Sequence, residues 1–314
     1  MINLFRNAII ISSIFLLGFM SQASAQTCAP GKTTVQILGS AGPFPTPDRA
    51  SASYLLWEGG KAKMLVDIGG GAYFRFGQSE AKLSDLAMVG ISHLHPDHVA
   101  DLPALLWLSH AMRKKPLPIF GPNAGKGVPS ARGFDYAPDF PEFLSRLFDS
   151  KKGAFMVMGG TLGTQKRNGV LLDIGVIDVL KSEPSAVFEG EGIKVTALGI
   201  PHANMPTLAY RVETADGSVV FSSDQNGTNQ NFAEFAKNAD ILVMHMQIPV
   251  GAKHPLHAAP EVIGRIAQKA GARQLILSHI GTSGAELEAS IAEIQTLYNG
   301  KVTLGADLQC TPIS

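Results

Sequence analysis

The sequence predicts an α/β fold built as one domain. Short apolar segments rich in β-branched residues alternate with segments of helical periodicity along most of the 314 residues. No internal repeat or low-complexity linker interrupts this alternation, so we expect a single mature domain over 26–314. Hydrophobic residues make up 45% of the chain, which is enough to build one extensive core.

The predicted elements form two regular parts. The first part has strands at 33–40, 54–59, 62–71 and 86–92, a helix at 99–115 that ends in cations, and a strand at 116–121. The second part has strands at 192–200, 207–213, 219–223, 241–244 and 273–278, with helices at 232–239 and 260–271. Gly271 at the end of the last helix is typical of a helix C-terminus.

Residues 122–186 separate these two parts and lack their regularity. A short helix is predicted at 140–148, but loop-type sequence and a glycine-rich stretch surround it. We interpret 122–186 as a variable region that forms the wall or lid of a pocket.

The first 25 residues have the layout of a secretory signal peptide. Arg6 precedes an apolar run at 8–20, and Ala23-Ser24-Ala25 matches a small-x-small cleavage site. We therefore expect a periplasmic or secreted protein that begins near Gln26 and keeps no membrane anchor. A transmembrane anchor is the alternative, although the apolar run is short for a membrane span.

The chain has two cysteines, Cys28 and Cys310, at opposite ends of the expected mature protein. An oxidising compartment permits a disulfide between them, and free thiols are a liability there. We expect this bridge, and two unrelated thiols are the alternative.

The overall charge is balanced. Lys and Arg total 26, Asp and Glu total 26, and no basic stripe is visible. Because nucleic-acid binders usually carry such a stripe, we expect a small-molecule substrate and no nucleic-acid partner. The sequence leaves the oligomeric state open.

Metal-ligand residue types follow the ends of five predicted strands. They are His93, His95, Asp97 and His98 after the first, His202 after the second, Asp224 after the third, His245 after the fourth and His279 after the fifth. In α/β sheets, functional residues gather outside the carboxyl ends of strands, so these side chains are expected to converge. Imidazole and carboxylate suit zinc, and also iron or manganese.

The segment HLHPDH at 93–98 is the densest part of this set. His93 and His95 are two residues apart on an extended segment, so both imidazoles point to the same side. Asp97 and His98 lie at the start of the next helix and can face a second point nearby. A polar helix cap is the alternative for this segment alone.

These motifs resemble the metallo-β-lactamase fold superfamily of binuclear metallohydrolases over almost the full mature length. HLHPDH is that family's signature, and IPHANMPTLAYRVE, FSSDQNG and LILSHIG resemble its later motifs. ADILVMH and the segment from His257 to Ile280 look most like the branch of ribonuclease Z, arylsulfatase and cyclic-nucleotide phosphodiesterase. The resemblance implies a four-layer αββα sandwich.

The resemblance also implies the ligand set and the reaction. His93, His95 and His202 would hold one divalent ion, Asp97, His98 and His279 the other, and Asp224 would bridge them. Zn²⁺ is expected at both positions, with Mn²⁺ or Fe as alternatives. A hydroxide shared by the two ions would attack the substrate.

Other residues receive supporting roles. Asp97 and His245 are expected to act in the chemical step, His245 as proton donor to the leaving group or, alternatively, as an orienting residue. Asp67 and His257 are expected to support the ligands from behind. His254 either borders the substrate or is a surface histidine, and His110 is expected to be an ordinary helix residue.

The favoured function is exported hydrolysis of a small phosphodiester, such as a cyclic nucleotide, or of a sulfate ester. Ribonuclease Z activity is not expected, because members of that family carry a tRNA-gripping arm between the two corresponding motifs, and only 21 residues separate His202 from Asp224 here. A lactone or β-lactam hydrolase is the alternative, and a non-catalytic metal-holding protein is a third possibility.

Overall fold

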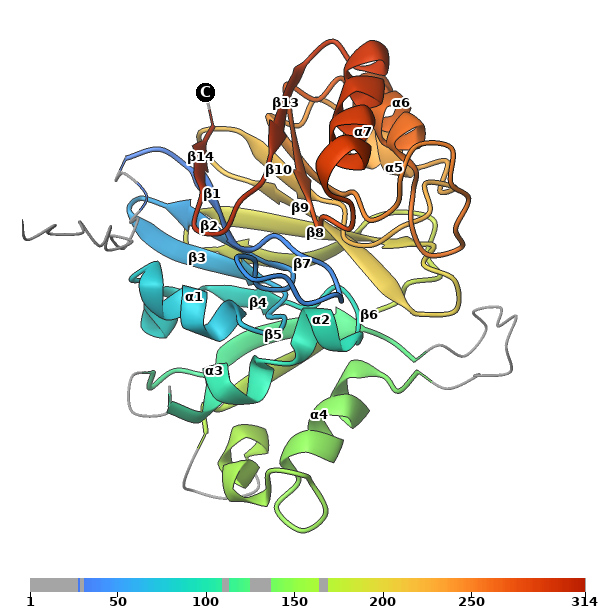
Figure 1. Cartoon of the computed structure of the whole chain (residues 1–314). Helices are drawn as coiled ribbons and strands as arrows, with labels where there is room; N and C mark the ends of the chain where they lie inside the picture. The colour runs from blue at the N-terminus through green and yellow to red at the C-terminus, as the bar shows by residue number, and fades with distance from the viewer. Residues whose placement is uncertain (1–27, 29–30, 109–112, 125–136, 164–168, 314) are drawn as a thin grey trace, which may run out of the picture.

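The computed structural model describes residues 28, 31–108, 113–124, 137–163 and 169–313, and these form a four-layer αββα sandwich (Figure 1). Within these residues two seven-stranded sheets lie face to face. Helices α1 (Ala72–Gln78), α3 (Leu102–Leu108) and α4 (Phe140–Phe148) belong to the outer layer of one sheet, and α5 (Phe232–Phe235), α6 (Pro260–Ala270) and α7 (Gly284–Leu297) to that of the other. The expected signal peptide and His110 lie outside the described residues.

The first sheet contains the amino-terminal strands. Its order is β14-β1-β2-β3-β4-β5-β6. The strands are β1 (Thr34–Gly39), β2 (Ser53–Glu58), β3 (Lys61–Val66), β4 (Met88–Gly90), β5 (Leu117–Pro122), β6 (Leu172–Ile177) and β14 (Cys310–Pro312). From β3 to β6 neighbouring strands are parallel, so their carboxyl ends share one edge.

The second sheet contains the carboxyl-terminal strands in the order β13-β12-β11-β10-β9-β8-β7. The strands are β7 (Ser185–Gly190), β8 (Ile193–Ile200), β9 (Thr207–Glu213), β10 (Ser218–Phe221), β11 (Ile241–His245), β12 (Gln274–Ser278) and β13 (Lys301–Leu304). Strands β10 to β13 are parallel. Strands β6, β7, β13 and β14 and helices α1 and α7 were not among the predicted elements.

Three apolar layers hold the sandwich together. The middle layer lies between the sheets, and the two outer layers lie between each sheet and its helices. Strand β2 shows the alternation that produces them, because Leu55 packs toward the helices while Tyr54 and Leu56 face the other sheet. Most of these strands are therefore buried on both faces, which explains why their sequences are continuously apolar.

The predicted helix at 99–115 is divided. A short helix α2 (Pro96–Val99) begins earlier than expected, and α3 follows after a break at residues 100 and 101. The break occurs because backbone groups pair with Ile68 instead of continuing the helix: the Ile68 amide donates to His98 and the Asp101 amide donates to Ile68. This pairing ties the HLHPDH segment to the end of β3.

The described part of the variable region lies against the edge of the first sheet. It contains α4, the 3₁₀ helix η3 (Met156–Leu162) and β6, whereas 125–136 and 164–168 lie outside the described residues. An apolar cavity of about 420 Å³ separates η3 from α3 and is lined by Ala104, Trp107, Phe155 and Val157 among others. The role of 122–186 as a lid stays a prediction.

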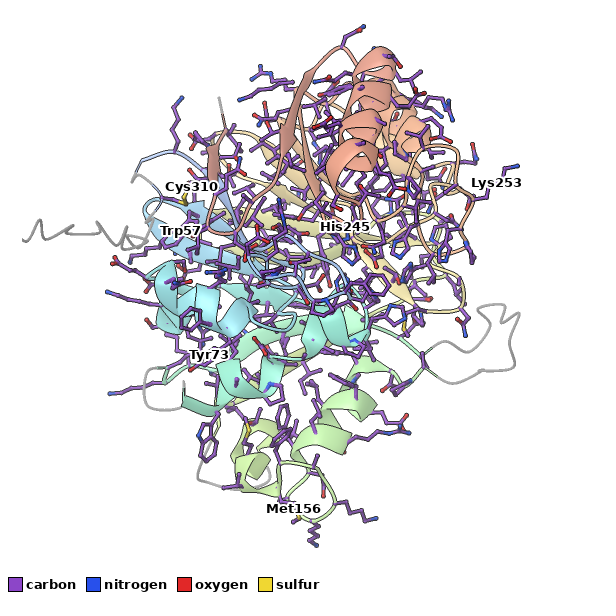
Figure 2. All side chains as sticks on the ribbon, in the orientation of Figure 1. Trp57, Tyr73, Met156, His245, Lys253 and Cys310 are labelled. Atoms are coloured by element: carbon purple, nitrogen blue, oxygen red, sulfur yellow. A yellow bond between two sulfur atoms is a disulfide. The ribbon has the colours of Figure 1, made fainter. Side chains whose placement is uncertain are left out.

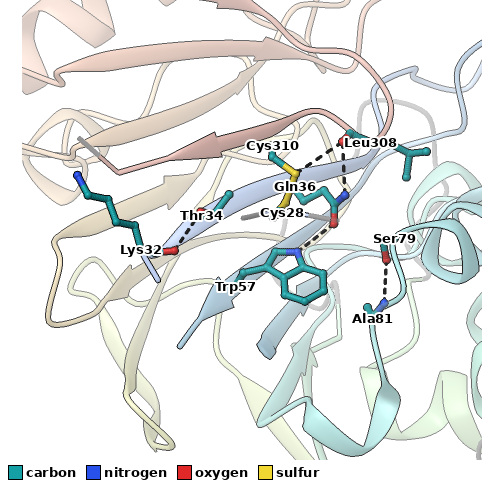
Figure 3. Close-up of a disulfide and its surroundings, with 9 residues drawn as sticks. All are labelled: Cys28, Lys32, Thr34, Gln36, Trp57, Ser79, Ala81, Leu308 and Cys310. Atoms are coloured by element: carbon teal, nitrogen blue, oxygen red, sulfur yellow. Dashed lines mark hydrogen bonds between the residues drawn. A yellow bond between two sulfur atoms is a disulfide. The ribbon is translucent and has the colours of Figure 1, made fainter. Parts of the chain in front are cut away.

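Cys28 and Cys310 form a disulfide, as predicted, with their Cα atoms 5.6 Å apart (Figure 3). Nearby, the Trp57 indole donates to the Gln36 amide oxygen at 2.9 Å, and the Gln36 amide donates to the Leu308 carbonyl at 3.4 Å. The bridge therefore fixes residue 28 beside the edge strand β14. Among the described residues, no helix has the length and apolar character needed to cross a membrane.

Candidate metal centre

Ligand-type side chains meet where strands of both sheets end. The first sheet contributes the segment 93–98 after β4, and the second contributes His202 after β8, Asp224 after β10, His245 at the end of β11 and His279 after β12. The second-sheet residues emerge at one edge because β10, β11 and β12 are parallel and β8 runs in the same direction. Figure 2 places His245 in the middle of the molecule, away from Met156 and Lys253 at its periphery.

One group of donors contains three histidines and one carboxylate. The Nδ1 of His95 lies 3.0 Å from the Nε2 of His93 and 3.2 Å from the Nε2 of His202. The Oδ2 of Asp224 lies 3.5 Å from the Nε2 of His202 and 3.9 Å from that of His93. These four donors lie within 4.8 Å of one another, a spacing that could hold a metal ion.

A second group lies on the other side of Asp224. The Nε2 of His279 is 3.4 Å from Asp224 Oδ1 and 3.1 Å from Asp97 Oδ2. The Nε2 of His98 is 3.7 Å from Asp97 Oδ2 and 3.7 Å from Asp224 Oδ2. The seven residues expected from the sequence are therefore brought together, and Asp224 lies between the two groups.

The alternative of a polar helix cap does not fit this geometry. His95 occupies the N-cap position of α2, but its side chain accepts no capping hydrogen bond. The Asp97 carboxylate pairs with His279 from the other sheet instead of with the α2 backbone. The segment is therefore oriented toward the cluster.

Asp67 contacts this segment through its carboxylate. Its carboxylate accepts hydrogen bonds from the Ser92 amide at 2.7 Å and the Ser92 hydroxyl at 2.7 Å, and it lies 2.7 Å from the Nδ1 of His98. The last contact fixes the His98 ring so that its Nε2 faces the two carboxylates of the cluster.

Buried polar atoms without partners support a metal at this position. The Nε2 of His98 is buried and has no hydrogen-bond partner within the described residues. Leaving such an atom unpaired is costly in a protein interior, and coordination to a metal ion would satisfy it. The donor set of imidazoles and carboxylates, without thiolate, fits a divalent ion such as zinc.

The electrostatics keep the three histidines of the first group in the neutral form that binds metal. Burial lowers the pKa of His93 and His95, and burial lowers the pKa of His202 to about 4, so these imidazoles are neutral near pH 7. For Asp224, burial alone would raise the pKa. The charges of His279 and His98 outweigh burial and hold the pKa of Asp224 well below its usual range.

The same competition acts on the second group. Burial would raise the pKa of Asp97, but the hydrogen bond from His279 prevails and lowers the pKa to about 2. Burial would lower the pKa of His98, but the carboxylates of Asp67 and Asp224 raise it well above its usual value. The cluster therefore stabilises positive charge next to Asp224.

Three residues at the strand ends have left-handed backbone conformations, which are uncommon for residues other than glycine. They are Asp67 with φ 58°, Ser223 with φ 51° and His279 with φ 53°. Such conformations typically cost about 1–3 kcal/mol each and persist where the surrounding structure imposes them. Each lies in the cluster or next to one of its residues, which is where functional strain concentrates.

His245 has a different environment from that of a free proton donor. Its Nδ1 lies 2.6 Å from Asp224 Oδ1, and its Nε2 lies 2.9 Å from the hydroxyl of Tyr54. Burial lowers the pKa of His245 to about 4, so the ring is neutral near pH 7. His245 also belongs, with His98, Asp224 and His279, to a group of donors within 4.8 Å of one another that could hold a metal ion. Because both of its nitrogens have protein partners, we interpret it as the orienting residue that the sequence offered as the alternative.

The ring of His257 is less constrained by hydrogen bonds than the ring of His245. Its Nδ1 is buried without a hydrogen-bond partner in the described part of the chain and lies 3.9 Å from Asp224 Oδ2. Its ring centre is 5.4 Å from that of His202 and 5.6 Å from that of His279, so it borders both donor groups. Burial lowers the pKa of His257 to about 3. His254 is exposed beside it, with ring centres 5.5 Å apart.

Sequence reasoning missed Tyr54 as a residue of this region. Its position on β2 faces the other sheet, in a core layer that is otherwise apolar. A buried tyrosine hydroxyl requires a hydrogen-bond partner, which was the available signal. The sequence gives no indication of which partner, because 190 residues lie between it and His245.

The fold and this cluster define a metal-dependent hydrolase. The family model described as a beta-lactamase superfamily domain matches residues 65–280, so the chain belongs to that superfamily. The chain is similar to ribonuclease Z of Mycobacterium bovis, at 26% identity over 87% of this chain and 96% of the relative. It is also similar to the metallo-hydrolase YhfI of Bacillus subtilis, at 25% identity over 86% of this chain and 96% of the relative.

Solved structures share the fold. The crystal structure of Bacillus subtilis YhfI matches with a TM-score of 0.66 and 22% identity, over 90% of this chain and 99% of that chain. Human tRNase Z, short form, matches with a TM-score of 0.65 and 20% identity over the same shares. A diphosphatase of the PhnP family matches with a TM-score of 0.60 and 16% identity, over 90% and 98%. These matches confirm the predicted four-layer fold.

The relatives correct one expectation. We expected no nucleic-acid partner, and this is wrong, because curated relatives that align over nearly their full length are ribonuclease Z. The expectation failed because a short connection and a zero net charge do not exclude binding to RNA. The short connection between His202 and Asp224 consists of β9 and β10 and removes one means of gripping tRNA. A net charge summed over the whole chain says nothing about local contacts with an RNA backbone.

Proposed function

We propose that this protein is a phosphodiesterase with two divalent metal ions, most simply Zn²⁺. His93, His95 and His202 would hold one ion, and Asp97, His98 and His279 the other. The observation that carries the proposal is the position of Asp224, whose two carboxylate oxygens face both groups. Mn²⁺ or Fe would be compatible with the same donors.

Bound divalent ions would supply Lewis-acid activation of water and neutralise charge that develops on phosphoryl oxygens. The protein's own residues supply the rest. Asp67 and the strained strand ends hold the donors in place before substrate arrives, which avoids reorganisation during the reaction. Asp97 remains ionised because its pKa is lowered to about 2.

His257 is the residue that we assign to the leaving group. It borders both donor groups and has an unpartnered nitrogen, whereas both nitrogens of His245 are engaged. A neutral imidazole can donate a hydrogen bond to a phosphoryl oxygen. An anionic substrate nearby raises the pKa of the ring toward values that permit proton donation.

The relatives support a phosphorus-containing substrate. Ribonuclease Z and a PhnP-family diphosphatase both act on phosphorus esters or anhydrides, which supports phosphoryl chemistry over acyl transfer for this chain. RNA therefore belongs among the substrates to be tested, beside small phosphodiesters.

We also propose that the protein is exported. The support is the sequence pattern at 1–25 and the disulfide between Cys28 and Cys310, which persists in an oxidising compartment.

A panel assay tests the proposal. The purified protein, with and without added Zn²⁺ or Mn²⁺, is given bis-p-nitrophenyl phosphate, an RNA with a 3′ extension, p-nitrophenyl sulfate, an acyl lactone and nitrocefin. We expect metal-dependent cleavage of one or both phosphodiesters. Turnover of only the lactone or nitrocefin would contradict phosphoryl chemistry, and absence of metal binding would contradict the centre itself.

The role of His257 is tested by leaving-group dependence. His257→Ala should lose about 10²–10³-fold on an alkyl phosphodiester and much less on the p-nitrophenyl ester, whose leaving group needs little protonation. His254→Ala is the matched control, because His254 is the exposed neighbour. Equal losses on both substrates would argue against proton donation.

A further inference from the structure

We propose that Tyr54 is a positioning residue of the metal centre, which holds His245 and, through it, the carboxylate of Asp224. The inference rests on the proposed function, because it assumes that Asp224 serves both ions. Tyr54 is the second residue of β2, in the sheet opposite to the strands that lead to His245 and Asp224.

The contacts form one continuous buried chain. The Tyr54 hydroxyl oxygen lies 2.9 Å from the Nε2 of His245 and 2.9 Å from the Oγ of Ser278. The Nδ1 of His245 lies 2.6 Å from Asp224 Oδ1. Tyr54 is only 1% exposed and His245 5%, so water has little access to compete for these hydrogen bonds.

Strand geometry explains why these residues meet. On β11 and β12, which are parallel, His245 pairs in register with Ser278. Ile241 and Val243, at alternate positions of β11 before His245, belong to the core layer between the sheets, so His245 faces that layer. Tyr54 faces the same layer from β2 and is long enough to reach across it. Its hydroxyl therefore joins the ends of two strands that lead into the cluster.

The chemistry of the groups determines which atom donates and which accepts in each of these hydrogen bonds. An ionised carboxylate only accepts, so the Nδ1 of His245 must carry the hydrogen that Asp224 accepts. In a neutral imidazole the Nε2 is then an acceptor, and the Tyr54 hydroxyl is the donor placed to satisfy it. The rotatable hydroxyl of Ser278 completes the hydrogen bonding of Tyr54.

This arrangement matters because Asp224 has two oxygens with different surroundings. Oδ1 faces His245 and His279, whereas Oδ2 faces donors of both proposed ligand groups. A fixed hydrogen bond at Oδ1 sets the rotation of the carboxylate and therefore the direction of Oδ2. Without the Tyr54 hydroxyl, the ring of His245 is free to turn or to change tautomer, and the carboxylate loses its fixed partner.

The test begins with Tyr54→Phe, which removes only the hydroxyl. Tyr298→Phe is the matched control. Tyr298 follows the last residue of α7 and is 3% exposed, and its hydroxyl donates to the Ala272 carbonyl at 2.8 Å. Metal stoichiometry and affinity are measured by titration against a chromophoric chelator. We expect Tyr54→Phe to lower the affinity for one or both ions by about 10–100-fold, the usual range when a residue that hydrogen-bonds to a metal ligand is changed. Tyr298→Phe should bind metal with wild-type affinity. The proposal is overturned if Tyr54→Phe binds both ions as tightly as the wild type.

A double-mutant cycle separates positioning from general destabilisation. If Tyr54 acts through His245, the pair Tyr54→Phe with His245→Gln should bind metal no more weakly than His245→Gln alone. Losses that multiply would mean that the two residues act independently, and they would refute the proposal. If His245→Gln removes an ion completely while Tyr54→Phe has no effect, His245 is itself a ligand and the positioning chain is wrong.

One measurement does not depend on metal or on the folding of a variant. In metal-free protein labelled with ¹⁵N-histidine, the ring shifts of His245 report its tautomer. We expect hydrogen on Nδ1 and a hydrogen-bonded acceptor at Nε2, and the opposite tautomer would overturn the proposal. If the wild type shows this tautomer but binds no metal, the proposed function fails while the Tyr54 contact stands, so the two failures are distinguishable.

Discussion

Replacing Asp224 by Asn should weaken the binding of both metal ions, whereas replacing Asp97 by Asn should weaken the binding of only one. Oxygens of Asp224 lie 3.4–3.9 Å from donor nitrogens of both groups. Two unit charges about 4 Å apart attract by about 4 kcal/mol at an effective dielectric of about 20, and the attraction is about twice as large for a divalent ion. Loss of even the smaller attraction corresponds to about 10³-fold in affinity, so each ion should bind at least about 10³-fold more weakly to Asp224→Asn.

The control follows from the position of Asp97. Its Oδ2 contacts the Nε2 of His279 at 3.1 Å and lies 3.7 Å from that of His98, both of which belong to the second group. Asp97→Asn should therefore release one ion at chelator concentrations that leave the other bound. Elemental analysis and competitive chelator titration measure both variants, and turnover of bis-p-nitrophenyl phosphate follows occupancy. If Asp224→Asn retained one ion at wild-type affinity, the shared position of this carboxylate would be refuted.

Three further predictions concern stability and processing. In EDTA-treated protein the free energy of unfolding should fall as the pH drops from about 6.5 to about 4. The pKa values of His202 and His245 are lowered to about 4 in the folded state, so the unfolded chain takes up protons first. The expected slope is about 1.4 kcal/mol per pH unit for each histidine, and a flat urea-denaturation profile would contradict it. Denatured, non-reduced protein should titrate no free thiols, and breaking the Cys28–Cys310 bridge should cost at most about 5 kcal/mol of stability; two free thiols would disprove the bridge in solution. Expressed from the full sequence in a Gram-negative host, the protein should be found in the periplasm and begin near Gln26 by mass spectrometry, and recovery only from the cytoplasm with Met1 intact would count against export.

The strand-end pattern was available from the sequence because it is local. Each buried strand has a recognisable apolar run, and the residue after it is read directly from the chain. The rule that functional residues gather at strand carboxyl ends then placed His202, Asp224 and His279 beside the HLHPDH segment without any knowledge of distances. The bridge between Cys28 and Cys310 was predictable for a similar reason, since the chain offers only one pairing.

The break between α2 and α3 was only partly available in this way. The segment 99–115 has the composition of one helix except for Pro103, which lacks an amide hydrogen and is tolerated only in the first turn of α3. Backbone hydrogen bonds from Ile68, about 30 residues earlier, end the first helix. Tertiary context of this kind overrides helix propensity, which is worth less than about 1 kcal/mol per residue for ordinary residues.

The contacts of His245 and His257 could be learned only from the tertiary structure. Their sequence positions made His245 the attractive proton donor, but its two nitrogens are occupied by Asp224 and by Tyr54 from the opposite sheet. Alternation along a strand tells which side chains face a core layer, and it is fixed by the sequence. Which residue lies across that layer depends on how the two sheets stack, and the contact between Tyr54 and His245, 191 positions apart, is set by that packing alone.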